Sequence, residues 1–259
     1  MALGCSLLLL LPLPRGLLAA RADPPPDAVC ATLGPEAHSI LRVLVGRDRV
    51  VPIQPGDLAR TRQTRPIAAL ILSEDWSNDA DLDAARAAGI AVVRVKRHTS
   101  LANIFANIRL LADFTGTSQA GTHWIASIED GLTRIRQSIS DLPRVRVLVL
   151  SPEGYMQGQG ALITKLIDVA GGINTAADAG IPEARQIDDT QIRDFRPEVV
   201  LLVDWTADSA VRFAANPLYR AIPAFDQDRL YRTAALGKDP AQLVEDVQML
   251  ADWLHPVEF

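Results

Sequence analysis

SQAGTHWIASIEDGLTRIRQSISDL, residues 118–142, carries a sustained helical pattern. Its apolar residues recur every three or four positions, which predicts an amphipathic helix with one buried face: Trp124, Ile125, Ile128, Leu132, Ile135 and Ile139. Such a helix is about seven turns long. Pro143 ends it because proline has no amide hydrogen to donate. We therefore predict one long helix that separates two other parts of the chain.

Short apolar runs precede this helix and alternate with helical patterns, as is typical of parallel sheets flanked by helices. The segment 79–88 has the apolar spacing of one such helix. Four runs are predicted strands: Ala28–Leu33, Val50–Ile53, Ala68–Leu72 and Ala91–Val95. Together these elements predict an N-terminal α/β lobe over residues 23–117.

The same alternation resumes after the helix. Ser151-Pro152-Glu153-Gly154 is a turn signal that leads the chain toward the next helix. The predicted strands here are Val145–Leu150, Val199–Val203 and Arg229–Thr233. The fold class that we predict is α/β, with two α/β lobes joined by residues 118–142 and the second lobe over residues 143–259. One continuous doubly wound sheet is the alternative.

The first residues indicate the compartment. The apolar run Leu7–Leu18 is followed by Ala20-Arg21-Ala22, a small-x-small cleavage pattern, and the run is shorter than the roughly 20 residues of a membrane-spanning helix. We expect a signal peptide over residues 1–22 and export to the periplasm. Cys5 precedes the apolar run, so it is not the lipidated cysteine of a lipoprotein. Cys30 alone remains after cleavage, which excludes an internal disulfide framework.

Composition and charge narrow the classes of partner. The chain has 259 residues, of which 48% are hydrophobic, and a formal net charge of −5. It has no cluster of Lys and Arg of the kind that the phosphate backbone of nucleic acid demands. We expect a globular protein that binds no nucleic acid.

Several separate stretches resemble one family. They are ATLGPEA at 31–37, GRDRVV at 46–51, AAGIAVV at 87–93, SLANI at 100–104, GQG at 158–160, AGGIN at 170–174, FRPEVV at 195–200, NPLY at 216–219 and LHP at 254–256. In this order and spacing they resemble the periplasmic binding proteins of siderophore, haem and vitamin B12 importers. The resemblance implies a non-catalytic receptor, without cofactor or bound metal of its own, that holds its ligand between two rigid lobes. It also implies a monomer that delivers the ligand to an ABC permease.

The chain departs from the family between the second and third strands, where only residues 54–66 remain. The family has an extra strand and helix there, including a glutamate that docks on permease arginines. The matching glutamate of the second lobe falls near Asp188-Asp189-Thr190. We expect Asp188 or Asp189 to take its place, because a carboxylate accepts a bidentate arginine contact. The alternative is a solvated loop and a helix start.

Ligands of open α/β sheets bind beyond the carboxyl ends of the strands, so we expect the binding residues in the loops that follow the strands. Trp76 and Trp205 follow strands of opposite lobes, and two indoles facing one cleft would suit a flat ring. The alternative is that each indole packs under its own loop. Tyr155 and Met156 follow the first strand of the second lobe and could reach a haem iron. The alternative for both is apolar filling at the edge of the lobe.

The remaining candidates are polar. The resemblance places His38, with Glu36 beside it, at a turn facing the cleft. The alternative for His38 is a surface residue at a helix start. Lys96 and Arg97, with neighbouring His98, would suit propionates or an anionic siderophore, or they belong to a solvated loop. His123 and His255 form no metal-ligand spacing with a carboxylate or thiol, so we predict no metal site.

Three other functions have some support in the sequence. Gly154, Gly158 and Gly160 form a GxxxGxG run like that of short-chain dehydrogenases, but no tyrosine is followed four residues later by the lysine that such enzymes need. Ser151 lacks the G-x-S-x-G elbow of a hydrolase. The third rival is a degenerate binding or sensor protein of the same fold, suggested by the shortened first lobe.

Overall fold

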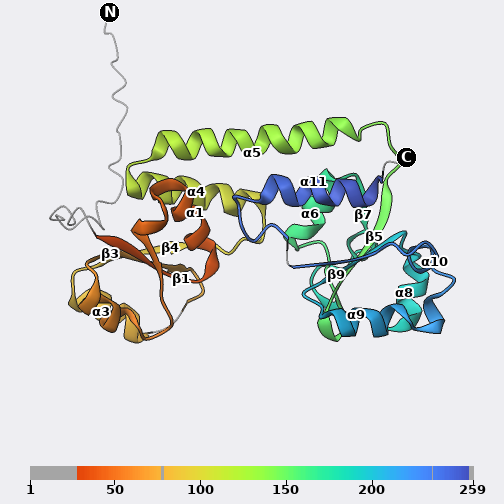
Figure 1. The fold of residues 1–259 in the computed structure, drawn as a ribbon, viewed down its shortest axis with the longest axis horizontal. Coiled ribbons are helices and arrows are strands. Elements are labelled where there is room, and N and C mark those ends of the chain that lie inside the picture. Colours follow the sequence, from red (N-terminus) through yellow and green to blue (C-terminus); the bar gives the residue numbers. More distant parts are fainter. Residues whose placement is uncertain (1–27, 77–78, 235, 257–259) are drawn as a thin grey trace, which may run out of the picture.

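The computed structural model describes residues 28–76, 79–234 and 236–256. Two sheets lie side by side, each covered by helices, and one long helix runs over both (Figure 1). The predicted fold class is therefore confirmed. The predicted signal peptide, residues 1–22, lies outside the described residues. Within them, no helix combines the length and the apolar character needed to cross a bilayer.

The first sheet has four parallel strands in the order β2-β1-β3-β4. The predicted strands are all present, with ends within one residue of the predicted ones: β1 (Val29–Leu33), β2 (Val50–Pro52), β3 (Ile67–Ser73) and β4 (Ala91–Val95). Four helices cover the sheet: α1 (Pro35–Val45), α2 (Leu58–Thr64), α3 (Asp79–Ala87) and α4 (Leu101–Thr115). A short 3-10 turn, η1 (Arg47–Arg49), precedes β2. We call this sheet and its helices the N lobe.

The stretch between β2 and β3 holds the short helix α2, and its first turn is fixed by a buried carboxylate. The side chain of Asp81, on α3, accepts hydrogen bonds from the backbone N–H groups of Gly56 (2.7 Å) and Leu58 (3.1 Å). Unpaired amides at a helix start need such acceptors. The shortened stretch is thus a well-bonded connection.

The second sheet is mixed, in the order β10-β9-β5-β6-β8, with β7 paired to β5. The three predicted strands are present as β5 (Val145–Ser151), β9 (Val199–Val203) and β10 (Leu230–Thr233). Three short strands were not predicted, because none of them lies in an apolar run of four or more residues: β6 (Tyr155–Met156), β7 (Gly172–Asn174) and β8 (Arg185–Gln186). The strands β6 and β8 are antiparallel to their neighbours.

Helices and short 3-10 turns cover both faces of the second sheet. They are η2 (Pro152–Gly154), α6 (Leu162–Val169), α7 (Thr175–Asp178), α8 (Asp189–Phe195), α9 (Ala207–Ala214), η3 (Pro217–Tyr219), α10 (Pro223–Asp226) and α11 (Leu243–Leu254). We call this sheet and its helices the C lobe.

The long helix α5 (Ser118–Ser138) lies over α4 of the N lobe and α11 of the C lobe (Figure 1). It ends four residues before the predicted end at Leu142, because residues 139–142 form turns. Two glycines allow its close approach. A Cβ at Gly121 would lie 2.5 Å from the Cβ of Ala112 on α4, and one at Gly131 would lie 2.8 Å from Cγ1 of Val244 on α11. Each lobe therefore meets α5 at a glycine.

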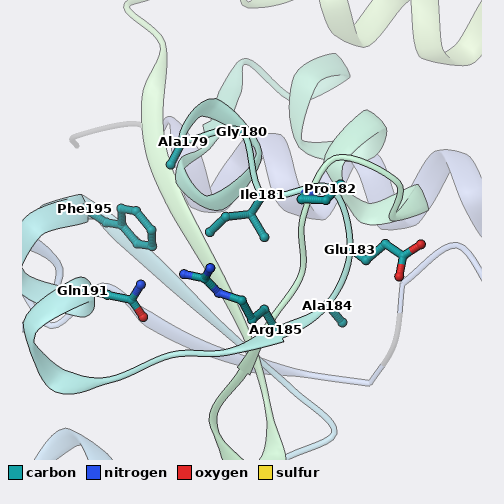
Figure 2. Close-up of a pocket in the computed structure, with 9 residues that line it drawn as sticks. All are labelled: Ala179, Gly180, Ile181, Pro182, Glu183, Ala184, Arg185, Gln191 and Phe195. Atoms are coloured by element: carbon teal, nitrogen blue, oxygen red, sulfur yellow. The ribbon is translucent and has the colours of Figure 1, made fainter.

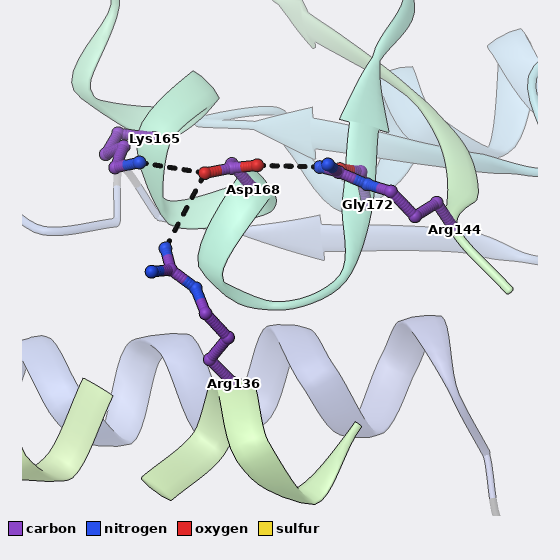
Figure 3. A network of polar contacts seen from close by, with 5 residues as sticks. All are labelled: Arg136, Arg144, Lys165, Asp168 and Gly172. Atoms are coloured by element: carbon purple, nitrogen blue, oxygen red, sulfur yellow. Dashed lines mark hydrogen bonds and ion pairs between the residues drawn. The ribbon is translucent and has the colours of Figure 1, made fainter. Parts of the chain in front are cut away.

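A polar network also ties α5 to the C lobe (Figure 3). The Asp168 carboxylate, on α6, accepts hydrogen bonds from Lys165 and Arg144, both at 2.8 Å, and lies 3.6 Å from the guanidinium of Arg136 on α5. Arg144 also donates to the Gly172 carbonyl oxygen. Burial would raise the pKa of Asp168, but the bonds from Lys165 and Arg144 hold it below its usual value. The ionised carboxylate of Asp168 thus forms ion pairs with three cationic side chains, one of which belongs to α5.

Candidate ligand site between the lobes

The two lobes meet at the loops that follow their parallel strands. The four strands of the N lobe are parallel, so the loops after them share one edge of the sheet. The segment after β10 reaches this edge from the C lobe: the Nδ1–H of His98 donates to the backbone carbonyl oxygen of Lys238 at 3.2 Å. A carbonyl oxygen only accepts, so this contact fixes the proton of the ring on Nδ1. The structure therefore brings loops from both lobes together here.

The carboxylates of Glu36 and Asp239 influence the pKa values of the two imidazoles at this junction, His38 and His98. Burial lowers the pKa of His98, and the Lys238 carbonyl, Glu36 and Asp239 only partly oppose it. Burial likewise lowers the pKa of His38; nearby Arg42 lowers it further, while Asp239 raises it. Burial thus favours the neutral form of both imidazoles. Across the described ranges, no three His, Cys, Asp or Glu residues are grouped to hold a metal ion.

A pocket of about 320 Å³ opens at the carboxyl edge of the N lobe and contains two of the predicted residues, His38 and Trp76. Its other walls come from the loops after β1 and β2: Thr32, Leu33, Gly34, Pro35, Pro52, Ile53, Gln54 and Pro55. The His38 Nδ1 lies 3.2 Å from the hydroxyl oxygen of Thr32. The indole of Trp76 is half-buried, and its Nε1–H is buried with no acceptor among the described residues. An aromatic ring and an imidazole therefore share one small pocket.

The loop that carries Trp76 is held by Arg94, on β4. The guanidinium of Arg94 donates to the carbonyl oxygens of Glu74 and Trp76, both at 3.1 Å. Arg94 was not predicted as part of the site, because its side chain acts on a loop 18 residues earlier in the chain. It fixes the position of Trp76.

Lys96 and Arg97 are exposed at the carboxyl edge of the N-lobe sheet, the same edge that carries this pocket. The backbone N–H and carbonyl of Lys96 are both bonded to the side-chain amide of buried Asn107, at 2.8 and 2.7 Å. The Arg97 guanidinium lies 3.6 Å from the Asp75 carboxylate. The backbone of this basic pair is thus fixed while the side chains face solvent.

The C-lobe aromatic residues differ in accessibility. The Nε1–H of Trp205 donates to the Leu150 carbonyl oxygen at 3.1 Å, and its ring packs on Phe213 with centroids 5.1 Å apart. Trp205 is thus half-buried under its own loop, and no described contact joins it to Trp76. Tyr155, by contrast, is 43% exposed.

Met156 does not lie where a ligand could reach it. Its side chain is fully buried in the core with Leu148 and Leu150. Successive residues of a strand face opposite sides, so β6 turns Tyr155 outward and Met156 inward. The structure corrects the prediction that the thioether of Met156 contacts the ligand.

Asp188 and Asp189 both have internal partners. Asp188 caps α8: its carboxylate accepts from the backbone N–H of Gln191 at 2.8 Å. The phenol of Tyr219 donates to the carboxylate of Asp189, and burial together with this carboxylate raises the pKa of Tyr219. Both residues thus lie at a helix start, and their contact with a permease stays a prediction.

The glycine run after β5 is explained by packing. A Cβ at Gly158 would lie 2.3 Å from the carbonyl oxygen of Ile181, and one at Gly160 would lie 3.2 Å from that of Pro182. The backbone of residues 181–182 fills the space that a pyrophosphate would need against these glycines. This contact accounts for the GxxxGxG pattern without a nucleotide.

Lys238 and Asp239 are further residues at the junction between the lobes that were not predicted from the sequence. They follow Gly237 in the segment after β10. The signal was a charged Gly-Lys-Asp-Pro turn after a strand, but its approach to His98 depends on the tertiary path of the chain.

The comparisons with known proteins agree on one family. The model of the family described as periplasmic binding protein matches residues 69–235. A protein of Halobacterium salinarum, described as a cobalamin-binding protein, is 24% identical over 263 aligned residues, which cover 90% of this chain and 70% of that protein.

Solved structures share the fold. The periplasmic heme binding protein HutB of Vibrio cholerae has a TM-score of 0.75 at 16% identity, over 89% of this chain and all of that chain. The periplasmic heme-binding protein RhuT of Roseiflexus, solved in its apo form, has a TM-score of 0.72 at 22% identity, over 88% of this chain and 98% of that chain.

Proposed function

Because the chain belongs to the periplasmic binding protein family, we propose that it is the substrate-binding component of an ABC importer. Its ligand is a cobalamin-type corrinoid, a haem or an iron–siderophore chelate, held between the lobes. We place the corrinoid first, because the relative aligned over 90% of this chain is described as a cobalamin-binding protein. Haem comes second, on the two haem-binding proteins that share the fold.

The single observation that carries this proposal is the pocket shared by Trp76 and His38. Flat rings with apolar faces pack well on indole, and the Nε1–H of Trp76 is a buried donor with no acceptor in the described residues. Lys96 and Arg97 are exposed near the same edge and suit the acidic or amide groups at the rim of such a ligand. Glu36 and Tyr155 complete the contacts that we propose.

The receptor role itself is also a proposal. We propose that residues 1–22 direct export and that the mature chain is a non-catalytic monomer of three parts: residues 23–117, 118–142 and 143–259. Its partner is an ABC permease. We propose Asp188 and Asp189 as the docking carboxylates of the C lobe. Both residues are exposed at the start of α8, and each carboxylate accepts one hydrogen bond within the lobe, which leaves it further acceptor positions for an arginine.

The test is a titration of the purified protein with cyanocobalamin, haemin and a ferric siderophore, followed by visible absorption and tryptophan quenching. We expect saturable binding of one of them, weakened at least tenfold, about 1.4 kcal/mol, by W76A. The matched control is W253F, because Trp253 stacks on Tyr231 against the core cluster and away from this pocket, at a centroid distance of 4.8 Å.

Two outcomes would contradict the proposal in different ways. If none of the three probes binds, the ligand class is wrong. If one binds and W76A has the affinity of the unmodified protein, the ligand lies elsewhere and Trp76 is not part of its site.

A further inference from the structure

A second pocket lies in the C lobe, between the α7–β8 loop and α8 (Figure 2). Its volume is about 470 Å³, within the range of small-molecule sites. It shares no residue with the loops that carry the proposed ligand site. It is lined by Ala179, Gly180, Ile181, Pro182, Glu183, Ala184, Arg185, Gln191 and Phe195.

The guanidinium of Arg185 points into this pocket between Ile181 and Phe195 (Figure 2). The backbone of Arg185 is fixed on β8, which pairs with β6. Within the described parts of the chain, no side chain or carbonyl accepts a hydrogen bond from this guanidinium. The carboxylate of Glu183 points away from it (Figure 2). The pocket therefore holds an unneutralised positive charge.

Gln191 supplies a second donor. Its side-chain oxygen accepts from the backbone N–H of Asp188 at 3.3 Å, as part of the capping box of α8. This bond fixes the amide, so that its NH₂ group is the end left to donate. Figure 2 shows that nitrogen on the side of the Arg185 guanidinium. Two donors thus converge at one end of the pocket.

The walls around these donors are apolar. Ile181 is buried in the C-lobe core, and Phe195 packs against the same core. Ala179, Pro182 and Ala184 add no polar side chain. A ligand that fits must carry acceptors at one end and apolar surface at the other.

We infer that this pocket binds a small monocarboxylic acid, with the carboxylate on Arg185 and Gln191 and the apolar body against Phe195 and Ile181. Arginine recognises a carboxylate through two parallel hydrogen bonds, which are stronger than bonds between neutral groups. A single acidic side chain of a partner would leave most of the volume empty, so a free acid fits the pocket better. The inference does not depend on the ligand between the lobes.

The experiment titrates the full chain with benzoate and isovalerate, and with benzamide and isovaleramide as neutral counterparts of the same shape. Calorimetry gives the affinities. We expect the acids to bind at least tenfold more tightly than the amides, which is about 1.4 kcal/mol.

Two variants test the donors. R185M removes the charge but keeps an unbranched apolar side chain. Q191E keeps the capping bond, since glutamate also fills this place in a capping box, but replaces a donor with a negative charge. Both should weaken benzoate at least tenfold. R193M is the matched control, because Arg193 is exposed on α8 and lies outside the pocket.

Three results would overturn the inference: no saturable binding of either acid, equal affinity for benzoate and benzamide, or an equal loss in R193M and R185M. W76A should leave benzoate binding unchanged. This last measurement separates failure at this pocket from failure of the ligand site between the lobes.

Discussion

The two sides of the molecule are packed differently. Under α5, one hydrophobic cluster runs through both lobes and includes Ile128 of α5, Ile71 of β3 and Val149 of β5. On the far side of each sheet the cluster belongs to one lobe alone: the N lobe packs Leu70 against α2 and α3, and the C lobe packs Leu202 against its own aromatic residues. The hydrophobic core is therefore continuous between the lobes beneath α5, whereas on the opposite side each lobe has its own separate cluster.

This difference predicts which parts of the molecule can move when a ligand binds. A shared core resists relative motion of the lobes because interiors are close-packed and small changes in volume are costly. The loops of the two lobes are joined by a hydrogen bond from His98 to Lys238. Breaking this bond costs less free energy than disrupting the shared core. Ligand entry is thus expected to change the loops more than the core.

The largest expected effect comes from removing part of the shared core. I128A should lower the free energy of unfolding by about 2–5 kcal/mol, because Ile128 is 2% exposed. Hydrogen exchange should become faster in β1 and in β5 together, since Ile128 belongs to the cluster that runs through both lobes. The control L70A removes a side chain of the N-lobe cluster and should leave exchange in β5 unchanged. Faster exchange in one lobe only for I128A would contradict a shared core.

A smaller effect is expected at the glycine contact. Ala favours helix over Gly by about 1 kcal/mol, so G131A would stabilise α5 if space were free. We expect a loss of about 1–3 kcal/mol instead, because the new methyl group would meet Val244. Thermal unfolding measures the change.

The double variant G131A/V244A is the control for this contact. It should recover part of the loss, because the shortened side chain makes room, and the coupling is read from a double-mutant cycle. A more stable G131A protein would show that α5 and α11 are not this close.

The smallest effect concerns the polar contact between the loops. The pKa of His98 is lowered by burial, so the unfolded chain binds the proton more readily. The stability that neutral His98 contributes is therefore complete above its unfolded pKa of about 6.5 and is lost as the pH falls through the lowered folded value. Glu36, Asp239 and the Lys238 carbonyl face the ring and limit this loss.

H98Q should accordingly reduce the drop in melting temperature between neutral and mildly acidic pH. His38 and His255 also have pKa values lowered by burial, so part of the drop should remain. H123Q is the control, because His123 is exposed on α5. An unchanged pH dependence in H98Q would contradict the lowering of the His98 pKa by burial.

The elements with long, regular patterns could be predicted from the sequence. The helix at Ser118 and seven of the strands lie in stretches whose apolar pattern is long enough to show. The strands β6, β7 and β8 do not, and β7 is further hidden because Gly172 is required by its neighbours: a Cβ there would lie 2.6 Å from Cγ2 of Ile167.

The candidate site could be predicted only in outline. Loop position after a strand led to Trp76 and the family resemblance led to His38, and the two residues do share a pocket. It did not reveal which way a side chain faces, so Met156 was placed with Tyr155 although adjacent strand residues face opposite sides. Lys238 and Arg94 were missed because their roles depend on contacts between segments distant in the sequence.

The two glycine contacts of α5 also determine the angle between the lobes. Gly121 faces α4 and Gly131 faces α11, and each added residue turns an α-helix by about 100° and lengthens it by about 1.5 Å. One residue inserted between these glycines would swing the C lobe around the helix axis and carry Lys238 away from His98. The number of residues between Gly121 and Gly131 is therefore a constraint on sequence change, and deletions or insertions in this family member should be tolerated in loops but not there.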